Sequence, residues 1–159
     1  MRKTAMLGAA SCAALVLALA GAPAAQASEI NDAETLQSME ACELPGRSGF
    51  KFALWYNSGQ GGAFRNMHYA VYNFDALRPG DGHDHPLKFC LEGASSPWPG
   101  SLQRVKNNAA SGENFHYKYK ARVYFKSGYK GAQDWMAPYQ HIDQFRSVYN
   151  ENASFQFTT

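Results

Sequence analysis

Apolar and polar residues alternate along residues 115–126. One face of an extended chain is apolar or aromatic and carries Phe115, Tyr117, Tyr119, Ala121, Val123 and Phe125. The opposite face is polar and mostly basic, with His116, Lys118, Lys120, Arg122 and Lys126. A period of two sustained over roughly ten residues predicts a half-buried β-strand. Ser127-Gly128 then predicts a turn, and Gly131 marks a position where the backbone favours a residue without a side chain.

The chain contains an internal repeat. Residues 54–67 match residues 123–136 without a gap: Ser, Gly, Gly, Ala and Met coincide, and the first three positions are alike in type. A second match relates residues 105–111 to residues 148–154. The first match is offset by 69 residues and the second by 43, so the earlier copy carries an insertion of 26 residues. A duplicated supersecondary unit therefore organises the fold.

The later copy contains Tyr124, Tyr129 and Gly131, and after them Ser147 just before Val148. This order is an aromatic residue, four residues, a second aromatic residue, one residue and a glycine, followed later by a serine just before a β-branched strand. It resembles the Greek-key motif of βγ-crystallins.

The earlier copy matches the same motif in part. Trp55 and Gly62 match, whereas Gln60 stands at the second aromatic position and Arg104 at the serine position. The resemblance covers about residues 50–157, and it implies an all-β, βγ-crystallin-like sandwich of two four-stranded Greek-key motifs.

The domain organisation follows from this resemblance. We expect a βγ-crystallin-like domain over residues 50–159 with an insertion at about 73–99. The residues expected inside it are Leu54, Tyr56, Phe74, Val105, Tyr119, Val123, Phe125, Trp135, Phe145 and Val148.

The N-terminus has the pattern of a secretory signal peptide. A basic start at residues 1–3 precedes an apolar run at 5–22, and Ala25-Gln26-Ala27 supplies a small-x-small cleavage site. A membrane anchor is the alternative, but the run is short for one and is interrupted by Gly21 and Pro23. Removal of residues 1–27 leaves an N-terminal extension at 28–49, in which residues 31–40 form either a short helix or a flexible leader.

The mature chain is close to neutral. Loss of Arg2 and Lys3 with the signal peptide leaves 13 basic and 13 acidic residues. Bulk charge therefore gives no reason to expect a nucleic-acid or membrane partner, and we expect a secreted monomer. Cys42 and Cys90 remain, and in an exported chain they favour a disulfide over two unpaired thiols.

No cofactor and no catalytic activity are expected. The segment 78–86 is polar and turn-rich, and His83 and His85 are weak candidates for a zinc or copper site because no third ligand has a fixed place beside them. The resemblance suggests calcium, but across residues 142–147 only Asp143 and Ser147 fit the calcium-binding pattern. No nucleophile elbow, paired-carboxylate motif or phosphate-binding loop is present in the sequence.

The resemblance also suggests a function. With its export signal, the chain looks most like the secreted bacterial branch of the superfamily, which includes crystallin-like metalloproteinase inhibitors. This implies a secreted inhibitor of extracellular peptidases. We expect the insertion to provide the inhibitory loop, with Cys90-Leu91 as the candidate contact with the enzyme. The alternatives are a toxin-like or cell-wall-binding module, using Trp98, Phe89 and the basic face 118–130, and a stress-related structural domain.

Overall fold

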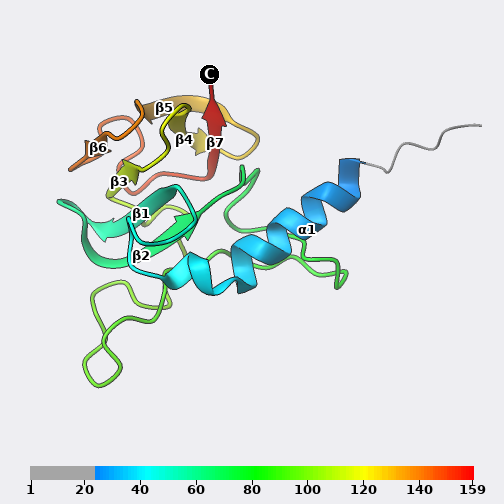
Figure 1. The fold of residues 1–159 in the computed structure, drawn as a ribbon, viewed down its shortest axis with the longest axis horizontal. Coiled ribbons are helices and arrows are strands. Elements are labelled where there is room, and N and C mark those ends of the chain that lie inside the picture. Colours follow the sequence, from blue (N-terminus) through cyan, green and yellow to red (C-terminus); the bar gives the residue numbers. More distant parts are fainter. Residues whose placement is uncertain (1–23) are drawn as a thin grey trace, which may run out of the picture.

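The structure is a computed structural model, and it describes residues 24–159. Residues 1–23, which hold most of the predicted signal peptide, lie outside the described residues. The elements in chain order are α1 (Ala24–Gln37), the 3-10 helix η1 (Met39–Cys42), β1 (Phe52–Asn57), β2 (Gly61–Met67), β3 (Ser111–Asn114), β4 (Lys120–Lys126), β5 (Lys130–Met136), β6 (His141–Ile142) and β7 (Ser154–Thr158). Figure 1 shows the strands gathered in one body, from which α1 projects.

The strands form two antiparallel sheets that exchange segments. The first sheet has the order β2-β1-β3-β6 and the second has the order β5-β4-β7. β6 follows β5 in the chain, yet it pairs with β3 in the first sheet. In return Val71, which follows β2, bridges to Phe155 of β7. The prediction of an all-β sandwich of two Greek-key motifs is confirmed, although a one-residue bridge replaces the fourth strand of the second sheet.

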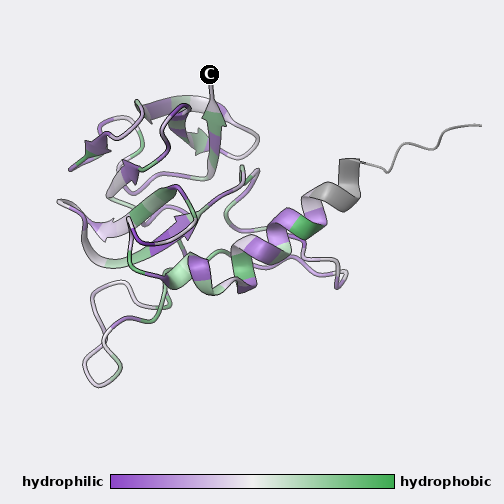
Figure 2. Cartoon of the chain, in the orientation of Figure 1, coloured by the Kyte–Doolittle hydropathy of each residue, from purple (hydrophilic) through white to green (hydrophobic). Residues whose placement is uncertain are grey.

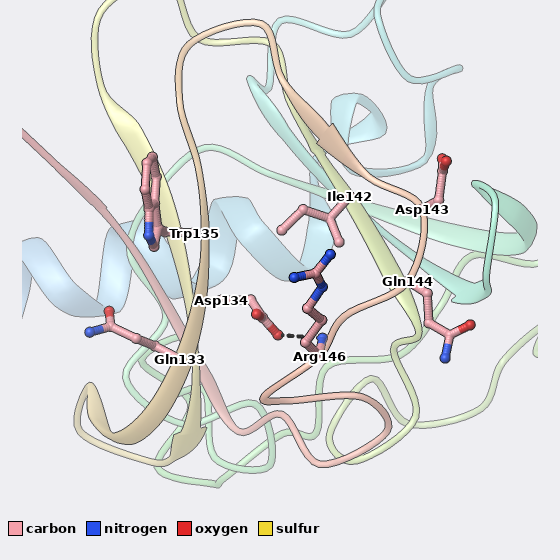
Figure 3. A pocket seen from close by; sticks show the side chains of 7 residues that line it. All are labelled: Gln133, Asp134, Trp135, Ile142, Asp143, Gln144 and Arg146. Carbon is pink, nitrogen blue, oxygen red and sulfur yellow. Dashed lines mark hydrogen bonds between the residues drawn. The ribbon is translucent and has the colours of Figure 1, made fainter.

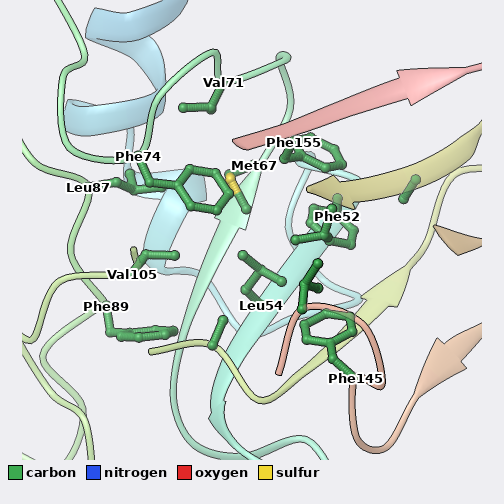
Figure 4. Packing of buried hydrophobic residues seen from close by; sticks show 14 of the residues in the cluster. Phe52, Leu54, Met67, Val71, Phe74, Leu87, Phe89, Val105, Phe145 and Phe155 are labelled. Atoms are coloured by element: carbon green, nitrogen blue, oxygen red, sulfur yellow. The ribbon is translucent and has the colours of Figure 1, made fainter. Parts of the chain in front are cut away.

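The core lies between the two sheets and draws on both copies (Figure 4). Phe52 of β1 stacks on Phe155 of β7 with ring centroids 4.1 Å apart. The insertion contributes four fully buried side chains, namely Phe74, Leu77, Leu87 and Phe89. The insertion is therefore part of the core as well as a surface feature. Burial of each such side chain contributes about 1.5–3 kcal/mol to folding.

Two residues expected inside the sandwich are outside it. Phe125 is 39% exposed and Trp135 is 51% exposed. The β4–β5 register shifts between Tyr124 and Lys126, so that Val123 and Tyr124 are both buried and Phe125 turns outward. Trp135 precedes the buried Met136 on the edge strand β5, and alternation places it on the outer face. Of the other expected core residues, Tyr56 and Tyr119 are half-buried and the rest are buried.

The strand predicted over 115–126 begins only at Lys120. Side chains upstream bond to the backbone and turn the chain: the Asn114 carboxamide donates to the carbonyl of Tyr119 and accepts from the amide of His116. The His116 ring nitrogen Nδ1 accepts from the amides of Lys118 and Tyr119. Such local bonds compete with the strand ladder, which explains why the alternation extends further than the strand.

The helix also differs from its predicted bounds. α1 begins at Ala24 and runs through the predicted cleavage site after Ala27, which stays a prediction. Asp32 lies within the helix and accepts a hydrogen bond from the amide of Arg78 at 2.8 Å. Hydrophilic and hydrophobic residues alternate in bands along α1 (Figure 2), and Leu36 packs against the core near its end.

Each copy folds its hairpin over in the same way. The pairing of Trp55 with Phe64 in β1–β2 is matched by the pairing of Tyr124 with Gln133 in β4–β5. Gln60 has φ 54° and Tyr129 has φ 60°, so glutamine adopts the backbone of the second aromatic position. Gly62 and Gly131 both have positive φ, at 72° and 83°, a region that glycine enters without steric cost.

A buried serine latches each folded hairpin. The Ser154 hydroxyl accepts from the amide of Tyr129 at 3.1 Å and donates to the carbonyl of Lys126 at 2.7 Å. In the earlier copy the Ser111 hydroxyl accepts from the amide of Gln60 at 3.2 Å and donates to the carbonyl of Asn57 at 2.7 Å.

These latches correct the serine positions predicted from the sequence. Ser147 is exposed, and only its backbone amide is bonded, to Asp134 Oδ2. Arg104 is exposed and faces Asp75 at 3.7 Å. Because the serine must reach the turn of the hairpin, the first residue of the returning strand takes this role, Ser111 in β3 and Ser154 in β7.

A buried asparagine joins the ends of the two copies. The Asn152 carboxamide donates to the carbonyls of Ala109 and Val148, at 2.6 and 2.9 Å, and accepts from the amide of Ala109 at 3.3 Å. Asn152 has no exposed surface, and all three bonds lie inside the protein. These bonds satisfy a polar group that would otherwise be costly to bury.

The serine latches predict that Ser111 and Ser154 contribute more to stability than the exposed Ser147. Ser154→Ala and Ser111→Ala should each lower the free energy of unfolding by about 1–3 kcal/mol, because each leaves a partly buried amide and carbonyl without their hydroxyl partner. Ser147→Ala, the matched control, should change it by less than about 0.5 kcal/mol. Urea denaturation followed by fluorescence measures all three, and a larger loss at Ser147 than at Ser154 would contradict the assignment.

Candidate functional site

The segment 91–98 forms a loop that projects from the body beyond β2, yellow-green in Figure 1. Its apolar side chains are presented to solvent: Leu91 is 54% exposed and Trp98 is 46% exposed. Internal bonds close the loop, with the amide of Trp98 donating to the carbonyl of Glu92 at 2.9 Å and the amide of Ser96 to that of Gly93 at 3.0 Å. Gly93 has φ 73°, which lets the chain turn at this point.

Both ends of the 91–98 loop are attached to β2. At its start the amide of Cys90 donates to the carbonyl of Phe64 at 2.9 Å, and at its end the carbonyl of Pro99 accepts from the amide of Ala63 at 2.8 Å. The predicted disulfide between Cys42 and Cys90 is confirmed and ties the same point to the N-terminal segment. The loop is thus fixed at its base by strand hydrogen bonds and a covalent bond.

Exposed apolar side chains lie close in the sequence to both cysteines of the disulfide. Met39 and Leu44 lie three and two residues from Cys42, and Leu91 directly follows Cys90; all three are exposed.

A buried arginine, which sequence reasoning missed, holds the N-terminal segment against this base. Arg65 of β2 donates through Nη2 to the carbonyls of Thr35 and Leu36, at 2.5 and 2.9 Å, and its Nη1 lies 3.6 Å from Cys42 Sγ. These carbonyls belong to the last turn of α1, whose partial negative charge favours a cation. Burial lowers the pKa of Arg65 to about 10, so the guanidinium remains charged at neutral pH.

The next residue extends the same attachment. The Asn66 carboxamide donates to the carbonyls of Glu40 and Glu43, at 3.0 and 2.6 Å, on either side of Cys42. Two consecutive polar residues in an otherwise apolar strand are the only signal that the sequence offers for this contact.

The candidate metal ligands of the insertion are engaged with one another. His85 Nε2 lies 2.6 Å from Asp81 Oδ2, and the amide of His83 donates to Asp81 Oδ1 at 3.0 Å. The bond from the amide of His83, and then that from His85, lower the pKa of the Asp81 carboxyl. Within residues 24–159 no group of three or more His, Cys, Asp or Glu side chains converges as metal ligands.

The corrected serine positions move the calcium pattern without completing it. Counted back from Ser154, the pattern falls on residues 149–154, and from Ser111 on 106–111. The pattern consists of two Asn or Asp residues, two spacers and then Ser/Thr-Ser. Each set has only one asparagine at its first two positions, Asn150 or Asn107, and an alanine at the position before the final serine. Neither set provides the oxygen ligands that calcium requires.

The alternative surface proposed from the sequence is only partly exposed. Phe89 is 1% exposed and packs in the core, where its ring lies 5.8 Å from that of Tyr56, so it cannot serve as a surface aromatic. On the basic face, Lys118, Lys126 and Lys130 are exposed, whereas Arg122 is tied to Thr158 and Gln133. Among the helices of the described chain, none is both long and apolar enough to cross a membrane.

Comparisons with known proteins bear on the fold alone. No protein-family model matches the chain, and no curated protein sequence does. A solved structure described as "Evolution of the eye lens beta-gamma-crystallin domain fold" is similar, with a TM-score of 0.47 and 14% identity over 72% of this chain and 94% of that chain. The chain has a βγ-crystallin-like fold, because its two hairpins are each latched by a serine and its two antiparallel sheets exchange segments.

The arginine contact predicts a loss of stability on neutral substitution. Arg65→Met keeps the length of the side chain but leaves the carbonyls of Thr35 and Leu36 without a donor, and the free energy of unfolding should fall by at least about 2 kcal/mol. Arg47→Met, at an exposed position, is the control and should change it by less than about 0.5 kcal/mol. Equal urea midpoints for the two variants would show that Arg65 does not hold the segment.

Proposed function

We propose that the chain is exported and inhibits an extracellular peptidase, with the 91–98 loop entering the cleft of the enzyme. The observation that carries this proposal is the attachment of the loop: it projects into solvent while both of its ends are bonded to β2 and its base carries the disulfide. The resemblance noted in the sequence favours a metallopeptidase as the target.

The attachment matters because binding orders whatever was mobile before. Immobilising a flexible side chain or loop costs roughly 0.5–1.5 kcal/mol for each rotamer-rich side chain, and a loop already held in one conformation avoids much of this cost. Leu91 and Trp98 are the side chains suited to fill apolar subsites, since apolar and aromatic anchors supply most of the affinity of such interfaces.

The export step agrees with the disulfide. Disulfides persist in oxidising compartments and are rare in the cytosol. The Cys42–Cys90 bond joins residues 48 positions apart in the sequence, a constraint worth on the order of 3–4 kcal/mol in the chain-entropy account. Reduction should therefore weaken inhibition by loosening the base of the 91–98 loop.

The test is an inhibition panel with the mature chain, residues 28–159, against thermolysin-like and other secreted peptidases. We expect stoichiometric inhibition of at least one metallopeptidase. Leu91→Asp should weaken it at least about tenfold, because a carboxylate would have to be desolvated in an apolar subsite. Tyr139→Ala removes another exposed side chain, from the turn between β5 and β6, and should leave inhibition unchanged. An uninhibited panel at molar excess overturns the proposal.

A backbone variant separates the shape of the loop from its side chains. A Cβ at Gly93 would collide with the carbonyl oxygen of Ser96 and would force a positive φ on alanine. Gly93→Ala should therefore distort the closed loop and weaken inhibition at least about tenfold while leaving the core intact. Full inhibition by this variant would show that the closed form of the loop is not what the enzyme binds.

A further inference from the structure

The equivalent strands β2 and β5 have opposite surroundings. They occupy the same place in the two copies, yet β2 is buried from Ala63 to Met67, whereas in β5 only Met136 is buried. Each is the first strand in the order of its sheet, so each presents a free edge unless another segment covers it.

The insertion and the N-terminal segment cover the edge of β2. Ala63 donates to the carbonyl of Pro99, Phe64 accepts from the amide of Cys90, and Asn66 binds the segment around Cys42. The positions of β5 that correspond to Ala63 and Phe64 are Ala132 and Gln133. Across residues 24–159, neither has a backbone hydrogen bond to any segment beyond β4.

A cleft of about 500 Å³ lies where the second copy lacks such a cover (Figure 3). Its lining comes from β5, from the last residue of β6 and from the segment after it: Gln133, Asp134, Trp135, Ile142, Asp143, Gln144 and Arg146. Ile142 corresponds to Pro99, but it pairs with Gly112 of β3 and its carbonyl accepts from Gln60 Nε2 at 3.1 Å. At Ile142 the segment is thereby bonded to the first sheet, and further along it is bonded to the side chain of Asp134 and not to the backbone edge of β5.

The cleft offers an aromatic surface and unpaired positive charge. Trp135 is half exposed and Lys120 Nζ lies 5.9 Å from the centre of its ring. Arg146 extends into the cleft (Figure 3) and forms no ion pair within the described chain. Asp134 is already engaged, because its Oδ2 accepts the backbone amides of three consecutive residues from Arg146 onward.

The remaining charges around the edge of β5 favour an acidic ligand. Lys126 and Lys130 flank the β4–β5 turn and are exposed. Two carboxylates of the lining oppose them, Asp134 and Asp143, and the Oδ1 of Asp143 lies 3.6 Å from His141 Nε2. With Lys120 and Arg146 the cations around the edge of β5 outnumber these carboxylates, so an anionic group is attracted to this edge, at a strength that salt will reduce.

We propose that the edge of β5 and this cleft bind an extended, acidic polypeptide segment as an added β-strand. The backbone of the segment would pair with Ala132 and Gln133, as the insertion pairs with β2 in the first copy. An apolar side chain of the segment would rest on Trp135, and a carboxylate would bind the guanidinium of Arg146 as a charge-assisted pair. This site is separate from the 91–98 loop.

Selection from a phage library of random linear peptides tests the site, followed by titration calorimetry with the selected peptides. We expect enrichment of Asp and Glu next to apolar residues, and affinity that falls as salt rises. Trp135→Ala and Arg146→Gln should each weaken binding at least about tenfold; the backbone amide that Arg146 gives to Asp134 is kept in the variant. No selected binder, or equal affinity for wild type and both variants, overturns the proposal.

Hydrogen exchange by NMR tests the mode of binding. Pairing of a strand should slow exchange of the amides along the edge of β5, around Ala132 and Gln133, when the selected peptide is added. A peptide that binds without slowing any amide of β5 overturns strand addition.

Trp98→Ala is the matched control, since Trp98 and Trp135 are exposed to a similar extent. It should leave peptide binding unchanged and weaken peptidase inhibition, whereas Trp135→Ala should do the reverse. Because each variant reports on one site, failure of this inference and failure of the inhibitor proposal are distinguishable. Loss of both activities in either variant would contradict two separate sites.

Discussion

The hydroxyl groups of Ser111 and Ser154 set the geometry on which both halves of this protein depend. Each bonds to the backbone on either side of a hairpin turn and holds the hairpin folded over. The folded form requires positive φ at the turn, which Gly62 and Gly131 adopt freely and which Gln60 and Tyr129 tolerate. Once both hairpins are held in this way, the segments that follow them can cross to the opposite sheet and close the core.

The two copies then diverge through what covers them. The insertion supplies core side chains such as Phe74 and Leu87, and it also supplies the segment that pairs with β2. Arg65 adds α1 to that edge through the last carbonyls of the helix. The later copy has no insertion, so β5 stays open. The surface features of this protein thus arise from one asymmetric addition to a symmetric frame.

The duplication and the sandwich could be predicted because the repeat of residues 54–67 at 123–136 preserves side-chain type at many positions. The disulfide could be predicted because Cys42 and Cys90 are the two cysteines left after the signal peptide. The sequence was insufficient for the serine: Ser147 precedes a β-branched residue and fits the pattern, while Ser154 precedes Phe155, and only the hairpin bonds distinguish them. A register shift turned Phe125 outward. Arg65 was missed because its partners are backbone carbonyls some 30 residues away, which leave no mark on side-chain pattern.

The burial of Asn152 has a consequence for the choice of expression host. Asn152-Ala153-Ser154 is an acceptor sequence for N-linked oligosaccharides, yet in the folded protein this carboxamide has no exposed surface and is bonded to Ala109 and Val148. A glycan attached during translocation in a eukaryotic secretory pathway would occupy the space in which the two halves close. Sugar transfer and folding are therefore mutually exclusive at this residue, and an oxidising compartment without N-glycosylation lets the disulfide form while Asn152 stays free to be buried.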